Sequence, residues 1–289
     1  MFRGAFQTAN EHIEQGLALY DYERHRRHAL VYMGHDPAVC AHACGAQAVW
    51  ALGLPDRAQR HGMQALELAR RLGHTPTLAF AFWYVSGGHA ARGDAAAVLS
   101  AVEELLPLSQ EQKFVQIEAS AQFLGGWALA STGEVKEGLE RMRVGFDIWN
   151  PTGMRTWLQM FTGLYADSLF RGRRYSEALE ALDRALEIGR QSGEQWWESG
   201  IHHLRGEALL RSGDGESAAA SLQKAIQVAR AQDAKSWELR AATSLARLWA
   251  EQGKRQDAHD LLAPIHSWFT EGFDTPDLKD AKALLDELA

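Results

Sequence analysis

Small residues recur along this chain at a fixed spacing of 40 positions, and this repeat constrains the fold more than any other feature. One column of such positions follows a turn glycine in each repeat and reads Ala58, Val98, Gly138, Ala178, Ala218 and Ala258. A second column, twelve residues earlier, reads Ala46, Ser86, Gly126, Ala166, Gly206 and Ala246. Paired antiparallel helices approach closely only where small residues meet. The two columns therefore predict a helical hairpin that is repeated six times.

The hydrophobic pattern between the columns is helical. Residues 175–191 (YSEALEALDRALEIGRQ) and 215–232 (GESAAASLQKAIQVARAQ) place apolar side chains at spacings of three and four, the period of an amphipathic helix. No segment shows the alternating pattern of a strand. A hydrophobic content of 46% supports a large core, which stacking of the hairpins would bury.

Helix start signals place the boundaries of the repeats. Asp36-Pro37 and Thr75-Pro76 each predict an N-cap followed by proline at the first helical position, and Pro107 should end its helix early. We expect a partial repeat and linker over 1–35, six repeats over 36–273, and a capping helix over 274–289. The individual repeats are predicted at 36–73, 74–113, 114–152, 153–192, 193–233 and 234–273.

Charge and hydropathy exclude several classes of partner. The 30 Lys and Arg against 37 Asp and Glu give a net charge of −7, which provides no general attraction to nucleic acid or anionic lipid. The first residues lack a signal-peptide core, and no apolar run reaches the length of a membrane span. We expect a cytoplasmic protein that binds neither nucleic acid nor membrane.

Each repeat carries the sequence signature of a known family. A small residue is followed twelve positions later by alanine, as at Ala178, and seven further on by another, as at Ala185. This pattern resembles tetratricopeptide repeats (TPRs), although the period of 40 exceeds that family's 34, as longer helices would require. The resemblance implies an all-α fold, a right-handed α-solenoid of about six TPR-like helical hairpins.

A second resemblance concerns longer stretches. Residues 12–21 (HIEQGLALYD), 193–199 (GEQWWES), 238–249 (ELRAATSLARLW) and 268–288 look like the C-terminal helical region of bacterial signalling proteins. Those proteins carry a class III adenylate or guanylate cyclase domain and an AAA-type or STAND-type ATPase domain upstream. The resemblance implies a sensing or scaffolding module from such a protein, either as a fragment or as a stand-alone relative. It implies no cyclase or ATPase activity here, because the GxxxxGK[ST] phosphate loop is missing.

Two clusters of side chains contain groups that could bind a metal ion or transfer a proton. His35, Asp36, Cys40, His42 and Cys44 combine soft sulfur with imidazole, which suits zinc, but structural zinc sites ordinarily use CxxC knuckles. We therefore favour core packing for the two cysteines and predict no metal site.

The second cluster is formed by His202, His203 and Glu207, which could act as an acid–base pair or as two metal ligands. A nucleophile or third ligand is missing, so exposed positions on a helix are the simpler interpretation. We predict no catalytic residue, no cofactor and no enzymatic activity.

The expected binding surface follows from the repeat. In TPR-like solenoids the first helix of each hairpin lines the concave face, and the positions one after and three before the small column point into the groove. This rule selects Gln47, Trp83, Phe123, Trp127, Asp167, His203, Glu207, Thr243 and Arg247. These nine residues form the predicted strip along the groove. The first part of the strip is aromatic and the last part is charged.

The leading functional hypothesis is an interaction module. Its groove would bind a peptide, a protein or another domain of a parent signalling protein, with aromatic anchors supplying affinity. The alternative is a small-molecule sensor, in which a sugar or other metabolite stacks on Trp83, Phe123 or Trp127 and regulates an upstream cyclase or ATPase. A pocket closed on several sides would favour the sensor, and an open groove would favour the protein partner.

Overall fold

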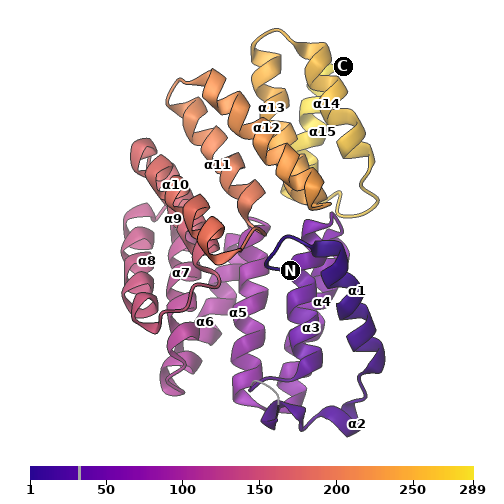
Figure 1. The fold of residues 1–289 in the computed structure, drawn as a ribbon, viewed down its shortest axis with the longest axis vertical. Helices are drawn as coiled ribbons and strands as arrows, with labels where there is room; N and C mark the ends of the chain where they lie inside the picture. Colours follow the sequence, from indigo (N-terminus) through magenta and orange to yellow (C-terminus); the bar gives the residue numbers. More distant parts are fainter. Residues whose placement is uncertain (32–33) are drawn as a thin grey trace. The chain divides into compact units, whose positions relative to one another are not determined.

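The computed structural model describes residues 1–31 and 34–289, and within them all regular structure is helical. There are fifteen α-helices and two short 3₁₀ helices in this part of the chain, without a strand (Figure 1). The expected all-α fold is confirmed. None of the described helices is both long enough and apolar enough to cross a membrane.

Six helical hairpins occupy the six predicted repeats. The first three pair α3 (Pro37–Ala51) with α4 (Pro55–Leu72), α5 (Thr75–Ala91) with α6 (Ala95–Glu111), and α7 (Val115–Ser131) with α8 (Val135–Trp149). The next three pair α9 (Leu158–Arg171) with α10 (Tyr175–Ser192), α11 (Glu198–Arg211) with α12 (Gly215–Ala231), and α13 (Lys235–Glu251) with α14 (Arg255–Ser267). A final helix, α15 (Pro276–Leu288), follows the last hairpin.

The segment before the first hairpin is irregular. It holds α1 (Phe6–Leu19), the single turn α2 (Tyr22–His25) and a 3₁₀ helix at His28–Leu30. Residues 32–33 of the linker expected here lie outside the described residues.

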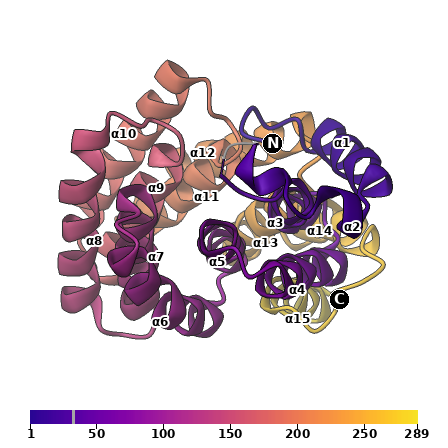
Figure 2. The same ribbon diagram turned by 90° about the horizontal axis from the view of Figure 1, so that it is seen from below.

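Contacts divide the chain into two compact units. The C-terminal unit comprises Met1–Gln7, Ala51–Asp56 and Thr156–Ala289, and the N-terminal unit comprises Thr8–Trp50 and Arg57–Arg155. The core of the C-terminal unit joins α12 to α15 through Leu222, Leu245 and Leu284. In the N-terminal unit, Ala43, Ala65 and Phe80 join α3, α4 and α5, and Figure 2 shows these three helices side by side. The sequence-based division into 1–35, 36–273 and 274–289 follows repeats rather than contacts and stays a prediction.

The small-residue columns lie where the two helices of a hairpin meet. A Cβ atom added at Gly126 would lie 2.5 Å from the carbonyl oxygen of Gly138 on the facing helix. At Gly206 it would lie 2.6 Å from Cγ of Leu222. The two helices therefore approach closely at these positions, through the backbone at Gly126 and through the Leu222 side chain at Gly206, as the small residues predict.

The first helices of successive hairpins form a row of their own in the C-terminal unit. Helix α9 contacts α11, α11 contacts α13, and α13 contacts α15. Within the described residues, the second helices α10, α12 and α14 share no comparable contact with one another. We call α9, α11, α13 and α15 the inner row, because the closer side of a curved stack is its inner side.

The helix starts partly match the sequence signals. Asp36 caps α3, since its Oδ1 accepts hydrogen bonds from the backbone N–H of Ala38 at 2.9 Å and of Val39 at 3.1 Å. The second signal is shifted by one residue: α5 begins at Thr75, so His74 is its N-cap and Thr75 is already helical. The imidazole of His74 lies 2.8 Å from the hydroxyl of Thr77, and this hydroxyl accepts a hydrogen bond from the backbone N–H of Asp36.

The expectation that Pro107 ends its helix is wrong. Helix α6 continues to Glu111. Leu105 and Ser109 on either side of the proline are both buried, and the Ser109 hydroxyl donates to the carbonyl of Leu106 at 2.8 Å. Packing of these neighbours, together with this side-chain hydrogen bond, offsets the free-energy cost of the backbone hydrogen bond that proline cannot donate.

Candidate functional site

The aromatic part of the expected groove lies in the N-terminal unit and is buried. The exposed fractions of Trp83, Phe123 and Trp127 are 6%, 0% and 2%. Phe123 packs edge-to-face on Phe146 and Trp149, with ring centroids 4.6 and 6.4 Å away. Helices α5 and α7 contact each other and α6, so their large side chains fill the space between helices. The expected open aromatic surface is absent at these three positions, and a ligand contact for any of them stays a prediction.

Gln47, the first member of the predicted strip, is also buried, at 3% exposure. Its amide nitrogen donates to the carbonyl of Tyr84 at 2.7 Å, which joins α3 to α5. This hydrogen bond ties two repeats together, and a ligand contact for Gln47 stays a prediction.

The charged part of the strip lies in the C-terminal unit and converges around His203 on α11. The ring nitrogen Nε2 of His203 lies 3.0 Å from the hydroxyl of Ser244 on α13 and 4.0 Å from Oε1 of Glu207. Asp167 on α9 is also close enough to influence the charge of His203. Side chains of α11 and α13 therefore meet at this imidazole, and the charge of Asp167 on α9 also acts on it.

Two further charged side chains complete this group, and the groove rule does not select them. Nε of Arg240 on α13 donates to both carboxylate oxygens of Asp277 on α15 at 2.8 Å. Both act on the charge of His203, Arg240 against protonation and Asp277 in favour of it. Arg240 lies one helical turn before Thr243, so extending the rule by one turn would have found it. We call Asp167, His203, Glu207, Arg240, Ser244 and Asp277 the inner-row polar cluster.

The last two members of the predicted strip lie on α13 in different surroundings. Thr243 is 4% exposed, and its hydroxyl donates to the carbonyl of Leu239 in the preceding turn at 2.8 Å. Arg247 is exposed and forms an ion pair with Asp280 on α15, at 2.8 Å. Of the nine predicted residues, the structure thus brings His203 and Glu207 together, whereas Asp167 forms an ion pair with Arg171 and acts on His203 through its charge.

The electrostatics of the inner-row polar cluster favour recognition over proton transfer. Burial lowers the pKa of His203 below its usual 6.5, against the opposing carboxylates of Glu207, Asp277 and Asp167. His203 is therefore neutral at pH 7 and offers one donor and one acceptor. Glu207 is one quarter exposed in its side chain and has no Lys or Arg partner within the described chain. A polar or basic group of a ligand could bind to this carboxylate.

The neighbouring His202 belongs to a different environment. Its Nε2 lies 4.0 Å from Glu198, and burial lowers its pKa to about 4, with help from Lys224 and Arg205. The two adjacent histidines thus contact different carboxylates and do not share a single acid–base site.

The cysteine cluster near α3 packs inside the N-terminal unit. Cys40 and Cys44 are both partly buried free thiols, and the ring of His35 stacks on Phe80 with centroids 3.9 Å apart. The imidazole of His42 faces that of His61, with their Nδ1 atoms 3.0 Å apart. Among residues 1–31 and 34–289, no three His, Cys, Asp or Glu side chains are arranged to hold a metal ion.

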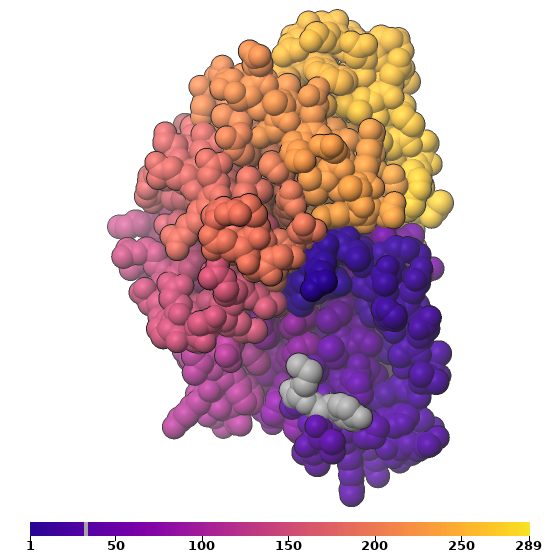
Figure 3. All heavy atoms as spheres, in the orientation of Figure 1, coloured from indigo at the N-terminus to yellow at the C-terminus, as the bar shows by residue number. Residues whose placement is uncertain are grey.

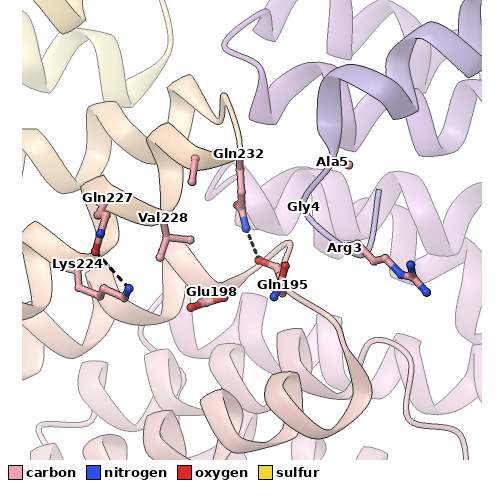
Figure 4. A pocket seen from close by; sticks show the side chains of 10 residues that line it. Arg3, Gly4, Ala5, Gln195, Glu198, Lys224, Gln227, Val228 and Gln232 are labelled. Atoms are coloured by element: carbon pink, nitrogen blue, oxygen red, sulfur yellow. Dashed lines mark hydrogen bonds between the residues drawn. The ribbon is translucent and has the colours of Figure 1, made fainter.

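A pocket of 370 Å³ lies on the C-terminal unit between the start of the chain and α12 (Figure 4). The amide of Gln232 reaches across to the carbonyl of Gln195 at 2.9 Å, and Nζ of Lys224 donates to Gln227 at 3.2 Å. Sequence reasoning did not indicate this pocket, because residues remote in sequence and outside the repeat columns form it. Its lining consists of Arg3, Gly4, Ala5, Gln195, Glu198, Lys224, Gln227, Val228, Ala231 and Gln232.

Comparisons with known proteins find similarity in fold but none in sequence. No protein-family model matches the chain. No curated protein sequence matches it either. A STAND protein with a tetratricopeptide repeat sensor from Pyrococcus horikoshii is similar in structure, with a TM-score of 0.63 and 13% identity. That similarity covers 98% of this chain and 42% of the other.

Two Rap structures are similar over their whole length. The apo form of RapI has a TM-score of 0.58 and 12% identity, with 98% of this chain and 99% of that chain covered. A Rap protein complexed with competence and sporulation factor has a TM-score of 0.55 and 12% identity, with 99% and 93% covered. Identities this low show the fold alone, and that fold is a TPR-like helical repeat.

Proposed function

We propose that this chain is a regulatory interaction module that binds a peptide or a protein segment on the inner row of its C-terminal unit. The inner-row polar cluster is the observation that carries the proposal. It combines Glu207, a carboxylate without a Lys or Arg partner among the described residues, with the neutral imidazole of His203 and the Arg240–Asp277 pair. These groups come from three different helices, α11, α13 and α15, and favour a ligand that runs across the row. No catalytic step is part of the proposal.

The similar proteins support this type of function. One is described as carrying a tetratricopeptide repeat sensor, and another was crystallised with competence and sporulation factor bound. Recognition of a peptide by an inner helix row needs charged groups that fix register, which the cluster supplies. Membership of a longer signalling protein, with other domains as the partner, remains part of the proposal.

Selection of binding peptides tests the proposal. Random peptides displayed on phage would be selected on the immobilised chain, and the enriched sequence would be synthesised and measured by calorimetry. We expect Glu207→Gln to weaken its binding by about tenfold or more, or about 1.4 kcal/mol, through loss of a charged contact. The matched control is Glu216→Gln, an exposed carboxylate on α12, which should leave the affinity unchanged. Equal effects of both variants would refute the proposed surface.

The second candidate is a small-molecule sensor, and the pocket beside α12 favours it. Its 370 Å³ fall within the usual size of ligand sites, and Lys224 and Glu198 supply both charges. A screen of sugars and phosphorylated metabolites by thermal unfolding tests this candidate. A compound that raises the melting temperature of the wild type but not of Lys224→Ala would support it, whereas equal shifts in both would contradict it.

A further inference from the structure

The first residues of the chain lie on the C-terminal unit like a bound peptide. The carbonyl oxygen of Phe2 accepts hydrogen bonds from the backbone N–H groups of Gln195 at 2.8 Å and Trp196 at 3.3 Å, in the loop between α10 and α11. Figure 3 shows the beginning of the chain, in indigo, against the orange surface of this unit. Main-chain hydrogen bonds of this kind hold any sequence, so the side chains must provide selectivity.

The ring of Phe2 provides the first selective contact. It packs edge-to-face on Trp157 and Trp196, with ring centroids 6.1 and 5.4 Å away. Both tryptophans are buried, and the backbone N–H of Trp157 is fixed by Oε1 of Glu194 at 3.1 Å. These two buried tryptophans form an aromatic surface that suits a phenylalanine anchor.

Gly4 provides the second selective contact. Its backbone has φ +76°, a conformation that favours glycine, and an added Cβ would lie 2.5 Å from Nε2 of Gln232. The amide of Gln232 is itself tied to the carbonyl of Gln195 at 2.9 Å. The side chain of Arg3, between the two contacts, is exposed. The surface therefore fits the pattern Phe-X-Gly, in which X can be any residue.

We propose that Trp157, Trp196 and Gln232 form a binding site for Phe-X-Gly peptides, with residues 1–7 as its resident ligand and a partner's Phe-X-Gly segment as their competitor. The site is separate from the inner-row polar cluster and does not depend on it. The backbone hydrogen bonds and ring contacts of Phe2, and the close approach of Gly4 to Gln232, are ones that a peptide from another chain could make. The 370 Å³ pocket beside Arg3 and Ala5 leaves room for a competitor with larger side chains at these positions.

The test measures binding of the segment as a separate peptide. A fluorescent peptide with the sequence of residues 1–7, MFRGAFQ, is titrated by anisotropy against the wild type, Phe2→Ala and Gly4→Val. In the wild type the tethered segment competes at an effective concentration of about millimolar. We expect both variants to bind the peptide at least about tenfold more tightly than the wild type does. The control peptide MARGAFQ, without the phenylalanine, should bind the variants at least about tenfold more weakly than MFRGAFQ.

Several outcomes would overturn the proposal. These are equal affinity of the wild type and both variants, equal affinity for the two peptides, and absence of binding. Loss of helical circular dichroism in both variants would show that the segment is a fixed part of the fold and would also overturn it. A concentration-dependent wild-type dimer that Phe2→Ala abolishes would assign the site to the segment of a second copy instead.

Discussion

Replacement of Gly126 by alanine tests the close contact between α7 and α8 in the N-terminal unit. The added Cβ would lie 2.5 Å from the carbonyl oxygen of Gly138 and 2.9 Å from the backbone nitrogen of Met142. Both are backbone atoms, so no side-chain rotation relieves the clash, and α7 and α8 must separate by about 1 Å to restore van der Waals contact. Overpacking lowers the free energy of unfolding by about 1–3 kcal/mol, whereas the higher helix propensity of alanine raises it by about 0.5–1 kcal/mol. We expect a net loss of about 1–2 kcal/mol.

The matched control is Gly62→Ala in α4, also a buried helical glycine of the N-terminal unit. Its Cβ would meet Val85 at 3.5 Å, an ordinary contact, so the variant should be as stable as the wild type or more stable by up to about 1 kcal/mol. Urea unfolding followed by far-ultraviolet circular dichroism measures both. If Gly126→Ala unfolds at the same urea concentration as Gly62→Ala, the backbone contact inferred from the small-residue columns is wrong.

Three further predictions concern capping and titration. Asp36→Ala should cost about 2–3 kcal/mol in urea unfolding, because it removes the cap of α3 and the acceptor of the Tyr20 hydroxyl, whereas Asp36→Asn keeps a capping oxygen and should cost less. Burial raises the pKa of Glu194 from 4.5 to about 7, so between these pH values the folded chain holds a proton that the unfolded chain has lost. The free energy of unfolding of the wild type, relative to Glu194→Gln, should therefore fall by up to about 3 kcal/mol as pH rises from 4.5 to 7, and a constant difference would contradict this. Burial, followed by Arg92, lowers the pKa of His89 from 6.5 to about 4, so urea midpoints of the wild type should fall more than those of His89→Gln as pH drops from 6.5 to 4.

The hairpins could be predicted from the sequence because their determinants are local and repeated. Positions such as Gly126 and Gly206 recur at 40-residue intervals, and close helix contact is the physical reason for their size. Some features that depend on a single helical turn could not be predicted correctly. The N-cap of α5 is one residue earlier than expected, and Pro107 is tolerated inside α6 because its neighbours are packed.

The candidate site was predicted only in part, because the groove rule fixes the helix face and not the distance between helices. It selected His203 and Glu207 correctly as neighbours, but it could not show that close helices bury Phe123 and Trp127. The Arg240–Asp277 pair depends on how α15 packs on α13, and α15 lies outside the repeat period. Docking of residues 1–7 likewise has no periodic signal.

Hydrogen–deuterium exchange with the phage-selected peptide bound tests the central claim most directly. If the inner row of the C-terminal unit is the binding surface, slowed exchange should concentrate in α9, α11, α13 and α15, and Glu207→Gln should reduce it at the same peptide concentration. Helices α10, α12 and α14 should exchange as they do without the peptide. Protection confined to those second helices, or found only in the N-terminal unit, would contradict the assignment of the inner row as the binding surface.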